Sequence, residues 1–130
     1  MTQASSDDRL QILAGVPVLV CAAAGEPIGD GPELNDLVGN AMAAGAELVA
    51  VPVGRLVPDF FDLSTRIAGE AIQKFVNYHL RLAFVGDLSE RLARSSALRD
   101  FVGESNRGNA VWFVEDLPSL AMRLAAHSPL

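Results

Sequence analysis

The fold is decided by the stretch VPVLVCA, residues 16–22, which is almost continuously apolar. Residues 10–13, just upstream, alternate in part between apolar and polar side chains, and Gly15 separates the two segments. An alternating segment, a turn residue and an apolar run together predict a short hairpin that leads into a buried strand.

Helices and strands are predicted to alternate along the rest of the chain. Apolar residues recur at helical spacing in four segments, and short apolar runs lie between them. The expected helices are 30–45, where Asp30 and Glu33 are spaced as in a capping box, 66–80, 96–104 and 118–126 with Asp116 as its cap; the expected strands are 47–53, 82–85 and 111–114. This order predicts an α/β fold, a single layered domain whose mixed, mostly parallel sheet is joined by right-handed crossovers.

The composition is that of a packed domain, since 50% of the residues are apolar and 20% are charged. We place this domain at residues 9–126 and expect residues 1–8 to form a flexible tail. The formal net charge is −6, and no cluster of Lys and Arg offsets it. Binding to nucleic-acid phosphates is therefore not expected.

Cys21 is the only cysteine, so neither an internal disulfide nor a zinc site of several thiolates can form. Its apolar neighbours predict a buried, inert thiol. His79 and His127 have no metal-ligand spacing, and we expect no metal or cofactor.

The polar start of the chain is unlike a secretory signal, and the longest apolar run is far shorter than the roughly 20 residues that cross a bilayer. We therefore expect a cytoplasmic protein that does not bind membranes.

Several segments, taken together, resemble a bacterial family known only as number 4180 among the domains of unknown function. The resemblance covers about residues 9–124 and implies the fold more than an activity. Arg66 departs from the pattern, because the family is expected to favour glycine after the threonine. The segments that carry the resemblance are DFFDL at 59–63, AGE at 68–70, QKFVNY at 73–78, GD at 86–87, SALRDF at 96–101 and ESNRG at 104–108.

The order of elements is also similar, more distantly, to that of STAS-type domains, the fold of bacterial anti-sigma-factor antagonists. Those domains also begin with a hairpin and continue with alternating helices and strands. In them, a serine at the start of the helix after the third strand is phosphorylated, and that helix contacts the partner. The equivalent stretch here is residues 62–65. This likeness is one of layout, and fold alone does not determine function.

Ser64 and Thr65 are therefore the candidate switch residues. A phosphate at the entrance to a helix changes local hydrogen bonding and the fit of a partner. The alternative is structural, in which Asp62 or Ser64 only caps the helix and satisfies unpaired backbone N–H groups.

One helix face carries the next candidates. Arg66, Glu70 and Lys74 stand four residues apart, which either solvates the helix or, with Asn77, builds a polar binding surface. Gly69 lies inside this helix, where glycine costs about 1 kcal/mol relative to alanine. We therefore expect another backbone or a ligand to approach the helix closely there.

Two further positions complete the candidate surface. Asp87 follows a buried strand, at the sheet edge where α/β proteins usually hold ligands, although it can equally be a turn residue. The polar run 104–108 ends a helix, and Asn106 or Gly108 can supply a left-handed cap. Arg107 suits an anion or a carboxylate, and with Glu104, Asn106 and the earlier Arg99 it forms a second candidate surface.

These observations favour a non-enzymatic regulatory or protein-interaction module of STAS-like shape that acts through the 66–80 helix and the 104–108 corner. The alternative is a small enzyme or ligand-binding protein with one polar pocket. Phe60 and Phe61, close to a loop, are consistent with a homodimer. The residues that would converge on the pocket are Glu70, Lys74, Asn77, Asp87 and Arg107.

Overall fold

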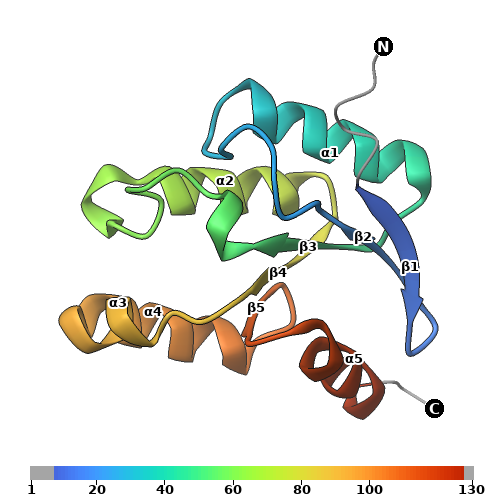
Figure 1. Cartoon of the computed structure of the whole chain (residues 1–130). Helices are drawn as coiled ribbons and strands as arrows, with labels where there is room; N and C mark the ends of the chain where they lie inside the picture. The colour runs from blue at the N-terminus through green and yellow to red at the C-terminus, as the bar shows by residue number, and fades with distance from the viewer. Residues whose placement is uncertain (1–7, 128–130) are drawn as a thin grey trace.

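Two residues, Ala14 and Gly15, turn the chain between the first two strands, β1 (Arg9–Leu13) and β2 (Val16–Val20). Their φ angles are 51° and 82°, and a two-residue type I′ turn requires both to be positive. The structure, a computed structural model that describes residues 8–127 (Figure 1), confirms the predicted hairpin.

The sheet has five strands in the order β1-β2-β3-β4-β5. The last three are β3 (Leu48–Pro52), β4 (Arg81–Val85) and β5 (Val111–Val114). β1 pairs with β2 in antiparallel orientation, and every later neighbour is parallel. The mixed, mostly parallel sheet predicted from the sequence is confirmed.

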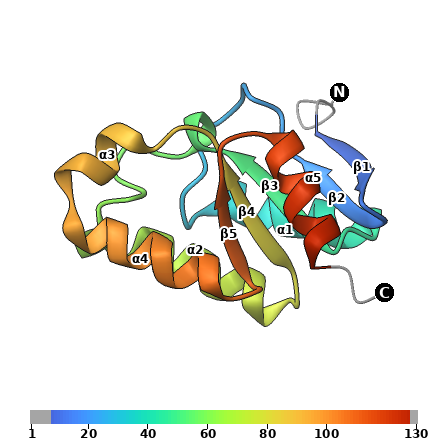
Figure 2. The same cartoon turned by 90° about the horizontal axis from the view of Figure 1, so that it is seen from below.

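Helices cover both faces of the sheet. Because the strands follow one another in chain order with crossovers of one hand, α1, α2 and α4 pack on one face, where the larger apolar cluster lies. α5 covers a smaller cluster on the other face and crosses in front of β2 and β3 in Figure 2. The helices are α1 (Pro32–Ala44), α2 (Ile67–Asn77), α3 (Ser89–Arg94), α4 (Ser96–Arg107) and α5 (Leu117–Ala126).

Alternate strand residues belong to different clusters, as the two-residue period of a strand requires. Leu19, Val49 and Leu82 face α1, α2 and α4, whereas Val18, Leu48 and Ala83 face α5. The strands are continuous apolar runs because both faces are covered. None of the helices within residues 8–127 is long and apolar enough to cross a membrane.

Two predicted caps differ from the structure and one agrees with it. Gly31, rather than Asp30, is the N-cap of α1 and makes no side-chain bond there, because Pro32 already occupies the first helical turn. Gly108 ends α4 with φ −96°, outside the left-handed region. Asp116 does cap α5, since its carboxylate accepts a hydrogen bond of 2.8 Å from the Ser119 N–H.

Two segments were not anticipated in full. α3 is a short helix without a clear apolar period, and α4 continues to Arg107 rather than ending at Glu104. Of the predicted tail, residues 1–7 lie outside the described part of the chain. Asp8 is described, and its carboxylate accepts a hydrogen bond of 2.8 Å from the Ala22 N–H.

Arg66 precedes α2 in a backbone conformation that favours glycine. Its φ is 67° and its ψ is 4°, in the left-handed region. A side chain there costs about 1 kcal/mol because Cβ crowds the neighbouring carbonyl oxygen. The glycine expected here from the sequence resemblance would therefore have a physical advantage.

We predict that Arg66→Gly unfolds with a free energy about 1 kcal/mol higher than Arg66→Ala. Both variants lack the guanidinium group, so the difference isolates the cost of Cβ in this conformation. Urea denaturation measures both values. Equal stabilities would show that the left-handed conformation carries no cost here.

Candidate functional site

The segment between β3 and α2, residues 53–66, is held in place by backbone bonds and buried rings. The Ile28 N–H donates to the Arg55 carbonyl at 2.7 Å, and the Val57 N–H donates to the Ile28 carbonyl at 2.9 Å. Phe60 and Phe61 are only 1% and 6% exposed. Phe60 is therefore not available for the homodimer contact inferred from the sequence, and Phe61 exposes only a small part of its ring.

These two rings belong to an aromatic cluster between the loop and the sheet. The Phe61 ring lies 5.0 Å from Phe60 and 5.4 Å from Phe84, edge to face in both cases, and 5.9 Å from Phe113. Such aromatic pairs contribute about 0.5–1.5 kcal/mol each beyond their burial. The cluster fixes where the chain leaves the core at Asp62.

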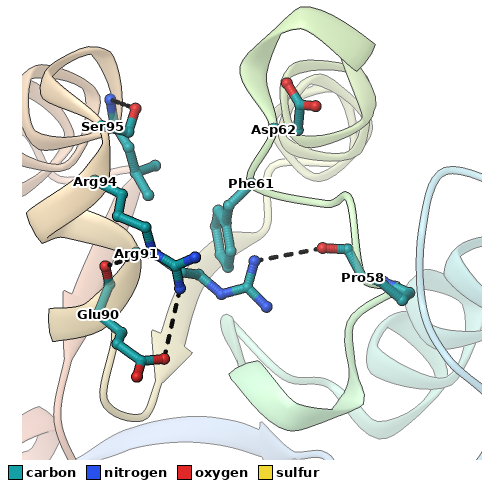
Figure 3. A pocket seen from close by; sticks show the side chains of 8 residues that line it. Pro58, Phe61, Asp62, Glu90, Arg91, Arg94 and Ser95 are labelled. Atoms are coloured by element: carbon teal, nitrogen blue, oxygen red, sulfur yellow. Dashed lines mark hydrogen bonds and ion pairs between the residues drawn. The ribbon is translucent and has the colours of Figure 1, made fainter.

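A groove of about 540 Å³ lies between this loop and helices α3 and α4. Figure 3 shows Arg91 and Arg94 projecting from one side toward Phe61, with Asp62 on the other side. Phe61 and Leu98 form its apolar base. We call it the arginine groove; its lining residues are Pro58, Phe61, Asp62, Glu90, Arg91, Arg94, Ser95 and Leu98.

The two guanidinium groups are only lightly engaged within the chain. Arg91 Nη1 donates to the Pro58 carbonyl at 3.3 Å. Arg94 Nη2 lies 3.6 Å from Glu90 Oε1, and both side chains are largely exposed. An exposed ion pair of this kind contributes about 1 kcal/mol or less. Both arginines can therefore turn to an incoming carboxylate or phosphate, which their planar donors suit.

Asp62, Ser64 and Thr65 form the turn beside this groove. Asp62 Oδ1 accepts hydrogen bonds from the Ser64 N–H at 3.2 Å and from Ser64 Oγ at 2.7 Å. It therefore caps the short 3-10 helix Leu63–Thr65. The Ser64 hydroxyl is exposed, and its hydrogen bond to Asp62 links it to a residue that lines the groove.

Thr65 has a different role from Ser64. Its hydroxyl donates to the Asp62 carbonyl at 2.8 Å and accepts from the Ile67 N–H at 3.3 Å. It therefore satisfies a backbone donor at the start of α2, as a capping side chain does. Thr65 holds the turn together, whereas the Ser64 hydroxyl lies on its outside.

Arg66 and Glu70 line a second groove, between α2 and α4, together with Gly69 and Phe101. Apart from its chain neighbours and the backbone of its own helix, a Cβ added to Gly69 would meet no described atom within 4 Å. Nothing within the described chain therefore makes the close approach that this glycine suggested. The space above it is open to a molecule from outside.

Lys74 and Asn77 point to different neighbours. Lys74 Nζ donates to Asn35 Oδ1 on α1, and Asn77 Oδ1 accepts from Gln73 Nε2 at 2.9 Å. Arg66, Glu70 and Lys74 therefore do not act as one ladder, because Lys74 joins α2 to α1.

Asp87 lies beyond the carboxyl end of β4. Its carboxylate accepts a hydrogen bond of 2.8 Å from the Ser89 N–H at the start of α3. This backbone bond, with a further bond from the Ser89 side chain, lowers the pKa of Asp87. Asp87 is thus used as a turn residue. Arg99, on α4, donates to the Leu92 carbonyl at 2.6 Å and ties α4 to α3.

The polar corner 104–108 precedes β5, so it lies at the end of the parallel strands opposite to Asp87, which follows β4. Asn106 Oδ1 accepts from the Phe113 N–H at 2.7 Å, and Arg107 Nη2 lies 2.8 Å from Glu104 Oε2. The sheet separates this corner from Asp87. The five polar residues considered as one pocket are therefore distributed over several surfaces.

Cys21 is buried and lines an apolar cavity of about 270 Å³ together with Val85 and Leu117. Burial, and to a lesser degree the nearby Asp8 carboxylate, raises the pKa of the thiol to about 12. The thiol is therefore neutral and unreactive near neutral pH. Within residues 8–127, no three His, Cys, Asp or Glu side chains lie together as metal ligands.

Arg91 and Arg94 were not among the candidates that the sequence patterns indicated. They lie on α3, a single polar segment, SERLAR, without an apolar period. The spacing of the two arginines was the available signal for a basic surface, because residues three apart lie on one helix face. Their position opposite Asp62 depends on how α3 packs against the loop.

The fold and this groove define a small α/β domain with a mixed five-stranded sheet and a polar groove beside the loop between β3 and α2. The model of a family described as a domain of unknown function, DUF4180, matches residues 13–124. The chain belongs to this family, as the sequence resemblance predicted. No curated protein and no solved structure matches the chain.

We predict that Cys21 in the folded protein reacts with iodoacetamide at pH 8 about a thousandfold more slowly than in urea. The rise in pKa from 9.0 to about 12 reduces the thiolate fraction by this factor. Mass spectrometry of timed samples measures both rates. Similar rates would mean that the thiol is accessible and ionisable in the native state.

We also predict that Thr65→Ala lowers the free energy of unfolding by about 1 kcal/mol, because it leaves the Ile67 N–H without its side-chain partner. Ser64→Ala should change it by less than about 0.5 kcal/mol, as is usual for an exposed side chain. Chemical denaturation of both variants tests the distinction. An equal or larger loss for Ser64→Ala would assign the structural role to Ser64 instead.

Proposed function

We propose that this protein is a regulatory, protein-binding module that works in the cytoplasm and engages its partner at the arginine groove. The proposal rests mainly on one observation. The exposed Ser64 hydroxyl is bound to Asp62, a residue that lines the groove, while the neighbouring Thr65 holds the turn. A group added to Ser64 can thus alter the groove without removing a bond that stabilises α2.

The groove has the properties that a peptide or a protein loop requires. It combines an apolar base, Phe61 and Leu98, with the cations Arg91 and Arg94. Arginine and aromatic side chains contribute disproportionately to protein interfaces. The partner segment would place an apolar side chain on the base and a carboxylate or phosphate against the arginines.

Phosphorylation of Ser64 is the proposed switch. The phosphate would add about −1.5 to −2 charge next to the Asp62 carboxylate, and repulsion would break the Ser64–Asp62 bond. It would also compete with an acidic partner for Arg91 and Arg94. The layout shared with STAS-type domains, in which a serine in the corresponding segment is phosphorylated, supports this assignment by analogy.

The test is quantitative capture of partners from native lysate with tagged full-length variants. We predict that the double variant Arg91→Glu, Arg94→Glu lowers the amount of a captured partner at least about tenfold, or 1.4 kcal/mol. Ser64→Asp should lower it as well, whereas Ser64→Ala should retain it. Intact-mass measurement of the native protein detects any phosphate, and fragmentation of its peptides should place it on Ser64 rather than Thr65.

The control is Arg107→Glu, which reverses one positive charge at the far end of α4, whereas the groove variant reverses two. It should leave capture unchanged. If the groove variants and this control retain the same partners in the same amounts, the groove is not the binding surface. If Ser64→Asp binds as Ser64→Ala does, the groove remains but the switch is refuted.

A further inference from the structure

The free edge of β1 is a second surface, independent of the arginine groove. Among residues 8–127, β1 comes first in the strand order and pairs with β2 alone, so no described strand lies along its other edge. Its sequence is RLQIL, residues 9–13. Natural edge strands usually carry lysine, proline or a bulge that prevents pairing with another chain. β1 carries no lysine or proline.

The hairpin turn determines which backbone groups of β1 point to this edge. The two-residue turn closes on the pair Leu13 and Val16, which is a hydrogen-bonded pair in hairpins of this type. Hydrogen-bonded and non-hydrogen-bonded pairs alternate along an antiparallel ladder. Arg9, Gln11 and Leu13 therefore bond to β2. The N–H and C=O groups of Leu10 and Ile12 point outward.

The same two residues expose apolar side chains. Leu10 is 45% exposed and Ile12 is 63% exposed. Leu10 pairs with Leu19 and Ile12 with Pro17, so both side chains lie on the sheet face that α1 covers further along. Free backbone groups and exposed apolar surface thus coincide at Leu10 and Ile12.

We propose that two copies of this chain pair through β1 in antiparallel orientation, with the two-fold axis at Gln11. In this register Leu10 of each copy lies opposite Ile12 of the other. Each such pair exchanges both of its N–H···O bonds and brings the two apolar side chains together on one face. The sheets of both copies then form one continuous sheet.

The edge of β1 is complementary to a second copy in this register and less complementary in the adjacent registers. If the register shifts by one residue, the free N–H and C=O groups of one copy lie opposite residues of the other copy whose backbone groups already bond to β2. Side chains from opposite faces of the sheet are then also paired. A shift of the axis to Leu10 pairs Ile12 with Asp8, and a shift to Ile12 pairs Leu10 with Ala14 in the turn. Arg9 is the only charged residue of β1. In the antiparallel arrangement the two Arg9 side chains lie at opposite ends of the paired β1 strands, so their like charges do not oppose pairing.

The first test is sedimentation of the full chain over about a hundredfold range of concentration. We expect a monomer–dimer equilibrium, and Ile12→Lys should raise its dissociation constant at least about tenfold. Val76→Lys is the matched control, because Val76 is 42% exposed on α2, which packs on β4 and on the turn before α2. It should leave the dissociation constant unchanged, and circular dichroism checks that both variants fold.

The second test concerns the register. The axis places the two Gln11 residues opposite each other in a non-hydrogen-bonded pair, where Cα atoms lie about 4.5 Å apart and a disulfide can form. Gln11→Cys should therefore give a covalent dimer on mild oxidation, whereas Arg9→Cys should not. The buried thiol of Cys21 is common to both.

A chain that remains monomeric at every concentration would overturn the proposal. A dimer that Ile12→Lys does not weaken would do the same, because another surface would then join the copies. Cross-linking through Arg9→Cys but not through Gln11→Cys would refute the two-fold axis at Gln11. None of these results depends on whether the arginine groove binds a partner.

Discussion

The burial of Phe61 between the sheet and the loop after β3 is the contact on which the functional surface depends. Its ring packs on Phe84 and Phe113, and Phe60 closes the cluster beside it. This packing fixes the point at which the chain returns to the surface at Asp62. The turn with Ser64, the start of α2 and the base of the arginine groove all take their positions from it. Aromatic packing therefore makes a loop into a defined site.

The order of the strands explains why the two ends of the sheet differ. Sequential strands with crossovers of one hand place α1, α2 and α4 on a single face, and α5 returns over the other face. The helices protect the middle of the sheet well. β1 is added by a hairpin instead of a crossover, so in the described part of the chain no helix covers Leu10 and Ile12 and no strand pairs with its outer edge.

Much of this fold could be predicted from local patterns in the sequence. The hairpin at Ala14 and Gly15, the apolar strands and the cap at Asp116 each depend on a few neighbouring residues. The capping box at Asp30 failed because Pro32 started α1 one residue later than the acidic residue required. α3 was not predicted, because a short polar helix has no apolar period and is held by its contacts with α4 and by the bond from Arg91 to the Pro58 carbonyl. The role of Thr65 was also not separable from that of Ser64, since both hydroxyls fit a cap until their partners are known.

The sequence alone therefore determined the class of fold, the single buried thiol, the acidic surface and the family. These properties follow from composition, from the periods of strands and helices and from motifs that are continuous along the chain. Only the tertiary structure brought Arg91 and Arg94 to the groove that Asp62 lines, buried Phe60 and Phe61, and separated Asp87 from Arg107 across the sheet. The physical reason is that these relations join residues distant in sequence, and they are set by the packing of side chains and by strand order, neither of which leaves a local pattern.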